Sequence, residues 1–403
     1  MQYVLLKTVY HKDRAKYRAL YEKRFQGEGT VHLPITIGEI PAFYCITGEL
    51  LDIVYDIAML NTHIFLIDAE LPPVTREQFI SSCLINEVAM TNRIEGIHSS
   101  RKEIGELLEG IRGTKNEDTL LGLILKYGRL ISGDHDRIQC CRDIRNLFDD
   151  LVAKEVAGEN PNEMPDGAIF RKDSVSIYTE SQKEIHVGLY PEEKIIAAME
   201  TAIGILNDQS QNKLIRIALF HYLFGYIHPF YNGNGRVNRF ISSAQLAQEL
   251  TPYICFQLSQ TIKNNTKKYY DAFQFCNHPL NKGDLTPFLI MFLKLVKGAA
   301  MEIKESLEQK YGDLKHYSLA LQELPLGKQE AVFLSVVIQA TLFSSDGRGI
   351  TNKELMEHLS ISRTTISHRV ERIRSLGEYI LTDYSGKVKY YKANLELLDQ
   401  ALS

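Results

Sequence analysis

The sequence lacks several features that would assign it to a class at once. None of its 403 residues falls in an apolar run of membrane-spanning length, and the opening Met-Gln-Tyr-Val-Leu-Leu-Lys is too short, and too polar afterwards, for a signal peptide. The six cysteines have no zinc-like spacing, and there is no repeat or low-complexity segment. The net charge of −4 gives no overall attraction to nucleic acid, so any such binding is expected to be local. These absences predict a reduced, cytoplasmic protein with no membrane partner.

Helical spacing of apolar side chains dominates what is present, and the length allows two or three domains. Residues 1–35 are polar and rich in Tyr and Arg, which predicts a partly ordered arm. Two short alternating runs around 174–187 predict a hairpin. From about residue 325 the composition changes to that of a compact basic unit. Helices are predicted over 41–65, 76–95, 101–112, 117–129, 135–154, 191–207 and 284–300.

The most informative stretch is 228–239, His-Pro-Phe-Tyr-Asn-Gly-Asn-Gly-Arg-Val-Asn-Arg, which lies between two apolar helical runs. Its glycines open the second helix, whose free N–H groups and positive dipole end suit a phosphate. Arg236 and Arg239 are three residues apart, so they are expected on one side of the first turn, next to a bound anion. His228 can accept a proton near neutral pH. The stretch therefore predicts a site for phosphoryl or nucleotidyl transfer.

This segment resembles the signature of the Fic family, His-Pro-Phe-x-(Asp/Glu)-Gly-Asn-(Gly/Lys)-Arg-x-x-Arg. Most Fic enzymes transfer AMP from ATP to a Ser, Thr or Tyr hydroxyl of a protein. The resemblance implies that His228 deprotonates the target hydroxyl and that Phe230 anchors the loop. It also implies that Arg236 and Arg239 neutralise the triphosphate. Three further residues, Gly233, Asn234 and Gly235, would cradle the phosphates.

One position departs from the signature, because Asn232 stands where the family has an acidic ligand of the magnesium ion. Mg²⁺ prefers anionic oxygens, although an amide oxygen can still coordinate it. We expect weaker binding of Mg²⁺ or Mn²⁺, with Asn232 as a weak candidate ligand. The alternatives are a slow adenylyltransferase, an enzyme with another donor or metal preference, and a nucleotide-binding relic.

A second motif ends the helix predicted over 76–95, Thr91-Asn-Arg-Ile-Glu95-Gly96. A carboxylate in the last turn of a helix opposes the helix dipole, which suggests that Glu95 has a partner elsewhere. The stretch resembles the Fic inhibitory motif, (Ser/Thr)-x-x-x-Glu-(Gly/Asn), whose glutamate pairs with the second arginine of the signature, here Arg239, and blocks the ATP γ-phosphate. The alternative is an exposed glutamate at a frayed helix end.

Two further segments resemble parts of Fic proteins. The hairpin with Val175 and Ile177 is similar to the flap, an edge strand that captures an extended target segment by backbone pairing. Tyr269, Tyr270 and Asn277 match the segment that lines the adenine pocket. Aromatic faces and an amide suit a purine, but aromatic pairs in helices are also common in cores.

The C-terminal unit has the order helix, turn, helix and hairpin, which resembles a winged helix-turn-helix module. Between 351 and 392 there are eight Lys and Arg residues against five Asp and Glu, a modest excess for a DNA binder, and winged helices also dock proteins. The candidate contacts with DNA or a protein partner are Arg363, Thr365, His368 and Arg369 on the second helix, and Lys387 on the wing.

Together these features predict a mainly α protein, a Fic helical bundle with a β-hairpin flap and a C-terminal winged helix-turn-helix domain. The leading hypothesis is a protein adenylyltransferase restrained by its own Glu95 and using ATP and Mg²⁺ or Mn²⁺. The sequence leaves the oligomeric state open, with a homodimer as one option. One alternative is a DNA-binding regulator with the Fic core as nucleotide sensor; another is a Fic enzyme that removes AMP or transfers another phosphate-containing group. The predicted boundaries are an N-terminal helical region 1–115, a catalytic core 116–305, a helical linker 306–328 and the winged helix 329–403.

Overall fold

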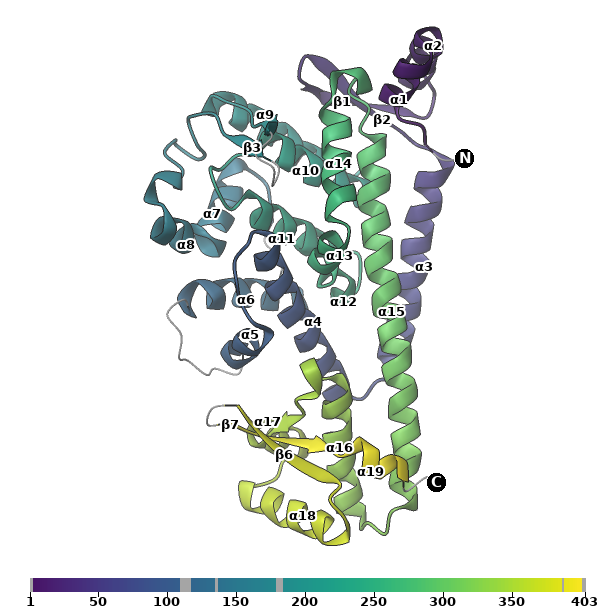
Figure 1. The fold of residues 1–403 in the computed structure, drawn as a ribbon, viewed down its shortest axis with the longest axis vertical. Helices are drawn as coiled ribbons and strands as arrows, with labels where there is room; N and C mark the ends of the chain where they lie inside the picture. Colours follow the sequence, from purple (N-terminus) through teal and green to yellow (C-terminus); the bar gives the residue numbers. More distant parts are fainter. Residues whose placement is uncertain (1–2, 109–116, 135–136, 179–183, 386–387, 401–403) are drawn as a thin grey trace. The chain divides into compact units, whose positions relative to one another are not determined.

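The computed structural model describes residues 3–108, 117–134, 137–178, 184–385 and 388–400. The chain forms two compact units. The first comprises Met1–Asn61 and Asn86–Met301, and the second comprises Thr62–Ile85 and Glu302–Ser403. Most described residues are helical, with three small antiparallel sheets, so the prediction of a mainly α fold is confirmed (Figure 1).

The N-terminal segment is more regular than the sequence suggested. Helices α1 (Leu6–Lys12) and α2 (Arg14–Phe25) precede an antiparallel hairpin of β1 (Thr30–Ile37) and β2 (Ile40–Cys45). Gly38 has φ +60° in the tight turn between the strands, a conformation that glycine adopts without strain. The predictions of a partly ordered arm and of a helix starting at residue 41 were therefore wrong. Helix α3 (Gly48–Glu70) begins only after the second strand.

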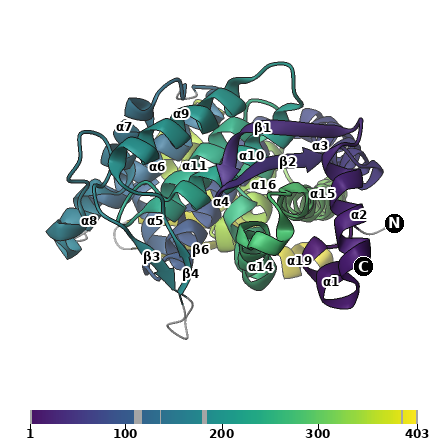
Figure 2. The same ribbon diagram turned by 90° about the horizontal axis from the view of Figure 1, so that it is seen from above.

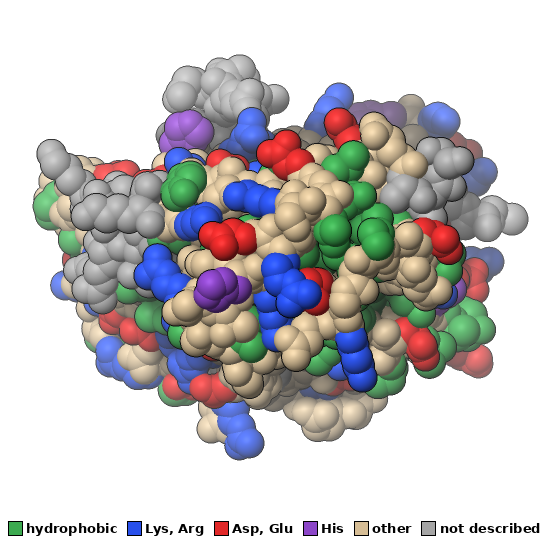
Figure 3. Space-filling view, turned by 90° about the horizontal axis from the view of Figure 1, so that it is seen from below, with side chains coloured by type: hydrophobic (Ala, Val, Ile, Leu, Met, Phe, Trp, Pro, Cys, Tyr) green, Lys and Arg blue, Asp and Glu red, His purple; other side chains and the backbone are tan. Residues whose placement is uncertain are grey.

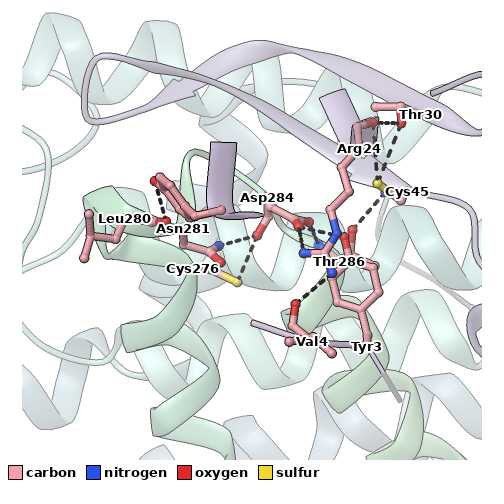
Figure 4. A network of polar contacts seen from close by, with 11 residues as sticks. Tyr3, Val4, Arg24, Thr30, Cys45, Cys276, Leu280, Asn281, Asp284 and Thr286 are labelled. Atoms are coloured by element: carbon pink, nitrogen blue, oxygen red, sulfur yellow. Dashed lines mark hydrogen bonds and ion pairs between the residues drawn. The ribbon is translucent and has the colours of Figure 1, made fainter. Parts of the chain in front are cut away.

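A buried carboxylate ties this segment to the rest of its unit. Asp284 is fully buried and accepts hydrogen bonds from the Tyr3 hydroxyl at 2.7 Å and from Arg24 at 3.2 Å (Figure 4). Its other oxygen accepts from the backbone N–H of Thr286 at 3.0 Å. Burial raises the pKa of Asp284, and these hydrogen bonds and the Arg24 charge oppose that rise. These long-range contacts explain the ordered arm, and a local pattern could not reveal them.

Helix α3 is long and apolar enough to cross a membrane by length and composition, and 28% of its most apolar window is buried. The prediction that no apolar run is long enough to span a membrane was therefore wrong for α3. The finding is weak evidence for a membrane, since core helices pass the same test. Asp56 on this helix makes a 2.6 Å ion pair with Lys297 of α15 (Thr286–Glu323).

The helical bundle of the first unit is built around α10 (Lys213–Ile227), whose side chains are buried on almost every face. It packs against α9 (Glu192–Asn207), α11 (Asn234–Leu246) and α14 (Thr266–Asn277) (Figures 1 and 2). The loop 228–233 joins α10 to α11 and so begins and ends in the core. The other elements of this bundle are α4 (Pro73–Ile94), α5 (Arg101–Leu108), α6 (Glu117–Ile131), α7 (Cys141–Leu151), α8 (Ala153–Glu159), the 3₁₀ turn η1 (Pro161–Glu163), α12 (Pro252–Cys255), α13 (Leu258–Asn264), η2 (Pro279–Asn281) and α15 (Thr286–Glu323). Of α4 only the part from Asn86 belongs to the first unit, and of α15 only the part up to Met301.

The predicted hairpin is present as β3 (Ser176–Tyr178) and β4 (Glu184–Val187), a two-stranded antiparallel sheet that projects from the bundle in Figure 2. The structure does not describe residues 179–183 between the strands. In the described part of the sheet, β3 pairs with β4 alone.

The second unit contains the predicted winged helix-turn-helix arrangement. Thr351 and Glu354 form the predicted capping box at the start of α17 (Asn352–Leu359), and Ser362 caps α18 (Arg363–Leu376). Three buried side chains of α18, Ile366, Val370 and Ile373, join the core of this unit. Its elements are α16 (Lys328–Phe343), η3 (Ser345–Gly347), β5 (Ile350–Thr351), α17 (Asn352–Leu359), α18 (Arg363–Leu376), β6 (Ile380–Ser385), β7 (Val388–Ala393) and α19 (Leu395–Gln400), with the sheet order β5-β7-β6.

Candidate functional site

His228 ends α10 in a left-handed conformation, with φ 53° and ψ 65°, which is uncommon for a residue with a side chain. Its backbone carbonyl accepts two hydrogen bonds from the buried guanidinium of Arg171, from Nε at 2.9 Å and from Nη2 at 2.8 Å. Arg171 also donates to the carbonyls of Asp173 and Leu189. One arginine therefore holds the chain reversal that orients His228.

The imidazole of His228 is a neutral base at physiological pH. Burial, together with the charges of the neighbouring His186 and Arg171, lowers the pKa of His228 to about 3, against a hydrogen bond with the backbone of Gly225 that raises it. A neutral imidazole can accept a proton, although the lowered pKa makes it a weaker base.

The loop after His228 is fixed from both sides. Phe230 is fully buried and stacks on Phe148 of α7, with ring centroids 4.2 Å apart. The Asn234 side chain accepts from the Phe230 N–H at 2.9 Å and donates to the Phe230 carbonyl at 2.7 Å. Gly233 caps α11 with φ 78°. The loop thus delivers the N-terminus of α11, with its free N–H groups, in a fixed position.

Arg239 and the end of α4 are joined by three hydrogen bonds. Arg239 donates from Nε to the Thr91 hydroxyl at 2.9 Å, and from Nη2 to the Thr91 carbonyl at 2.9 Å and to Glu95 at 2.8 Å. The arginine side chain is 3% exposed and that of Glu95 27%. Burial alone would lower the pKa of Arg239, but the charge and hydrogen bond of Glu95 together with the Tyr269 and Tyr127 side chains outweigh burial, and the net shift is upward. Gly96 follows with φ 80°, the left-handed residue that ends α4.

Arg236 has a carboxylate partner that the sequence did not reveal. Its guanidinium is 3% exposed and lies 2.7 Å from Glu155 of α8. Burial raises the pKa of Glu155, and the Arg236 charge opposes that rise. The two arginines of the loop therefore each face their own carboxylate, Glu155 for Arg236 and Glu95 for Arg239.

Asn232 is engaged in the loop and with a neighbouring turn. Its amide oxygen accepts from the Gly233 N–H at 2.6 Å, and its amide nitrogen donates to Glu163 at 2.7 Å. Within the described residues no group of three or more His, Cys, Asp and Glu side chains could hold a metal ion.

Most of the candidate residues line a cavity of about 300 Å³, within the range of ligand sites, whereas Asn232, Gly233 and Arg236 are not among its lining residues. His228, Asn234, Gly235 and Arg239 line it together with Glu95. The hairpin contributes Val175, Ser176, Ile177 and His186, and α14 contributes Tyr269, Tyr270, Phe273, Gln274 and Asn277.

The proposed adenine segment lies in this wall with most of its polar atoms already engaged. The Tyr269 hydroxyl is 2.7 Å from Nε2 of the buried His221, and Tyr222 donates to the amide oxygen of Asn277 at 2.6 Å. Tyr270 is 40% exposed. These residues therefore offer aromatic surface and the amide nitrogen of Asn277 to a ligand.

The polar face of the second unit is mixed in charge. Arg363 and His368 are exposed on α18, whereas Arg369 is partly buried and donates to Gln329 at 3.2 Å. The Thr365 hydroxyl lies 2.9 Å from that of Ser362. Figure 3 shows acidic side chains interspersed among the basic ones on the face that it views. Lys387 lies outside the described residues.

Comparison with known proteins identifies two regions. Residues 142–246 match the Fic/DOC family model and residues 337–387 match an HTH domain model. "Protein adenylyltransferase Fic" of Aedes aegypti and of Culex quinquefasciatus are each 36% identical to the chain over 72 residues. This match covers 18% of the chain and 13% of either relative, so the chain spans only a small part of their length.

A solved structure is similar over a longer stretch. The crystal structure of a Fic family protein from Desulfovibrio desulfuricans G20 has a TM-score of 0.56 and 18% identity. The match covers 87% of this chain and 97% of that one, which supports a common fold. The chain therefore contains a Fic/DOC domain followed by an HTH domain.

Proposed function

Because the chain contains a Fic/DOC domain, we propose that it transfers AMP from ATP to a Ser, Thr or Tyr hydroxyl of a protein. The observation that carries this proposal is the meeting of three features in one cavity: the neutral His228, the start of α11 and Arg239. Their chemistry is a base beside an anion site, as a transfer from a nucleotide requires. The curated relatives named as adenylyltransferases point to the same reaction.

The proposed reaction assigns a role to each group. His228 takes the proton of the target hydroxyl, whose oxygen attacks the α-phosphorus of ATP. A bond to the α-phosphorus forms, the bond from it to the bridging oxygen breaks, and pyrophosphate leaves. The N–H groups around Gly233, Asn234 and Gly235 and the charge of Arg239 bind the phosphates. Mg²⁺ or Mn²⁺, when bound, would neutralise phosphate charge near Asn232.

The flap is assigned to the protein target. Val175, Ser176 and Ile177 line the cavity beside His228, and β3 belongs to a sheet of two strands. An extended target segment can pair with a strand edge through backbone hydrogen bonds. Such pairing would bring a hydroxyl side chain towards His228 whatever its neighbours in sequence.

The same cavity contains the proposed restraint. Glu95 binds Arg239 at 2.8 Å, and a Cβ placed on Gly235 would collide with the Glu95 carboxylate, so this carboxylate lies against the first turn of α11. A phosphate bound at that turn needs both the arginine and the space. We assign Glu95 as the internal inhibitor, and the Thr91 contacts hold Arg239 where the carboxylate reaches it.

Transfer from labelled ATP tests the function. Label in the α-position should appear on protein in the presence of Mg²⁺ or Mn²⁺, and label in the γ-position should not. His228→Ala should abolish the transfer while ATP binding persists. Transfer of γ-label instead would assign the chain to phosphoryl transfer, and retained transfer in His228→Ala would remove the base assignment.

A second candidate function rests on the HTH match at 337–387, namely DNA binding by the second unit. Exposed Arg363 and His368 on α18 are the side chains best placed for it. Against it, Lys392 is paired with Asp383 at 2.7 Å, and Lys389 lies over the Tyr391 ring at 4.7 Å. Fluorescence anisotropy with duplex DNA should show salt-dependent binding that Arg363→Ala weakens. Binding without salt dependence would argue against this function.

A further inference from the structure

The signature loop has an asparagine at position 232 instead of a carboxylate, and the Asn232 amide does not replace a carboxylate as a ligand of a cation. The Asn232 amide oxygen accepts from the Gly233 N–H at 2.6 Å and so already serves the loop backbone. The amide nitrogen is a donor and cannot bind a cation. Asn232 as it stands is therefore a poor ligand for Mg²⁺, which favours anionic oxygens.

A carboxylate from another element lies where that charge is missing. Glu163 ends the 3₁₀ turn η1, and its Oε2 accepts from the Asn232 amide nitrogen at 2.7 Å. Its Oε1 accepts from the Asn160 amide at 3.0 Å. Asn160 also caps η1 through the Asn162 N–H at 3.2 Å, which fixes the turn that carries Glu163. Two neutral amides thus hold this carboxylate beside the loop.

The other carboxylates around the loop have different partners. Glu155 pairs with Arg236 at 2.7 Å, and Glu95 pairs with Arg239 at 2.8 Å. Asp166 accepts from the Tyr231 hydroxyl and from the Lys172 N–H. Of these carboxylates, Glu163 is the one that is hydrogen-bonded to Asn232, so it brings a negative charge to the position where the signature lacks an acid.

We propose that Glu163 supplies, from outside the signature, the anionic oxygen for the divalent cation that Asn232 does not provide. The inference rests on the proposed function, since the cation accompanies the nucleotide. One carboxylate together with substrate phosphates and water is a usual set of ligands for Mg²⁺ in nucleotide sites. Asn232 becomes the residue that positions Glu163, which gives a reason for an amide at a place where the family has an acid.

The test measures Mn²⁺ binding by the electron paramagnetic resonance signal of the free ion, with a non-cleavable ATP analogue present. The full chain with Glu95→Gly is the parent, so that the nucleotide site is open. Glu163→Gln removes the charge and keeps the shape of the side chain. Glu159→Gln, an exposed glutamate on the neighbouring α8, is the matched control for a change of one charge.

Glu163→Gln should weaken Mn²⁺ binding by about tenfold or more, and the control should bind as the parent does. Adding Asn232→Asp to Glu163→Gln should restore binding, which also shows that the variant is folded. Equal Mn²⁺ affinity in Glu163→Gln and parent overturns the inference. Binding of the analogue is measured separately both with Mn²⁺ and in excess EDTA, because a parent that binds no nucleotide under either condition refutes the proposed function itself.

Discussion

Replacing Glu95 by glycine should raise the affinity of the chain for ATP. The carboxylate occupies Arg239 at 2.8 Å, and it lies against the first turn of α11 at Gly235. A nucleotide phosphate must displace it from both places. Its removal therefore takes away an internal competitor, while the two Thr91 contacts continue to hold the arginine in the cavity.

The size of the effect follows from the geometry of the pair. A hydrogen bond between charged groups contributes about 1.5–3 kcal/mol, and water screens this one in part because the Glu95 side chain is 27% exposed. A net gain of roughly 1–2 kcal/mol corresponds to about 5- to 30-fold tighter ATP binding. Glu95→Gln should give a smaller gain, since the amide removes the charge but still fills the space.

Isothermal titration calorimetry with ATP measures these affinities directly. Arg93→Gly is the control, because Arg93 is exposed in the last turn of α4, two residues before Glu95, and a glycine inside the helix destabilises this end of α4 at least as much. Arg93→Gly should bind ATP as the wild type does. Unchanged affinity in Glu95→Gly, with the control also unchanged, would refute the competition between the carboxylate and the nucleotide.

Three other predictions concern the base and its support. Arg171→Met should reduce transfer strongly, because it removes the two hydrogen bonds that hold the His228 carbonyl. It should leave ATP affinity within about twofold, because Arg171 does not contact the phosphate site. An equal loss of transfer and of ATP affinity would mean general unfolding. Phe230→Ala should lower the free energy of unfolding by about 3–5 kcal/mol in urea titration, and a loss below 1 kcal/mol would contradict its anchoring role. His221 and His228 each have a pKa of about 3 in the folded chain, so only the unfolded chain takes up their protons as the pH falls below about 6.5. Stability should therefore fall from pH 6.5 to 5 by roughly 1.5 kcal/mol for each histidine, and a gain over that range would contradict the burial of both.

Sequence patterns predict the parts of the site that are local in the chain. The loop from His228 to Arg239 is contiguous, and its glycines and flanking apolar runs are enough to place it between two helices. The pairing of Glu95 with Arg239 spans 144 positions and was predicted only from the family resemblance.

The parts of the site that the sequence patterns do not predict are those that depend on packing between distant segments. Arg171, Glu155 and Glu163 lie 57, 81 and 69 positions from the loop residues they contact, and each sits in a segment with no motif of its own. The sequence around Arg171 does not indicate that its guanidinium donates hydrogen bonds to backbone carbonyls. A search for carboxylates near the signature could not find Glu163 either, because η1 reaches Asn232 only in the folded chain.

Contacts between distant segments also explain why the order of the N-terminal segment was not predicted. Its polar, aromatic composition suggested partial order, but Tyr3 and Arg24 both bind the buried Asp284, more than 250 positions later. Long-range polar contacts of this kind stabilise a segment without leaving a periodic pattern.

The most direct test of the central claim compares label transfer from α-labelled ATP by the wild type, Glu95→Gly and the double variant Glu95→Gly with His228→Ala. The account predicts that label on protein rises in Glu95→Gly and disappears in the double variant, while both variants still bind ATP. Measurable ATP binding with no label in any of the three would contradict the assignment as an adenylyltransferase and favour a nucleotide sensor.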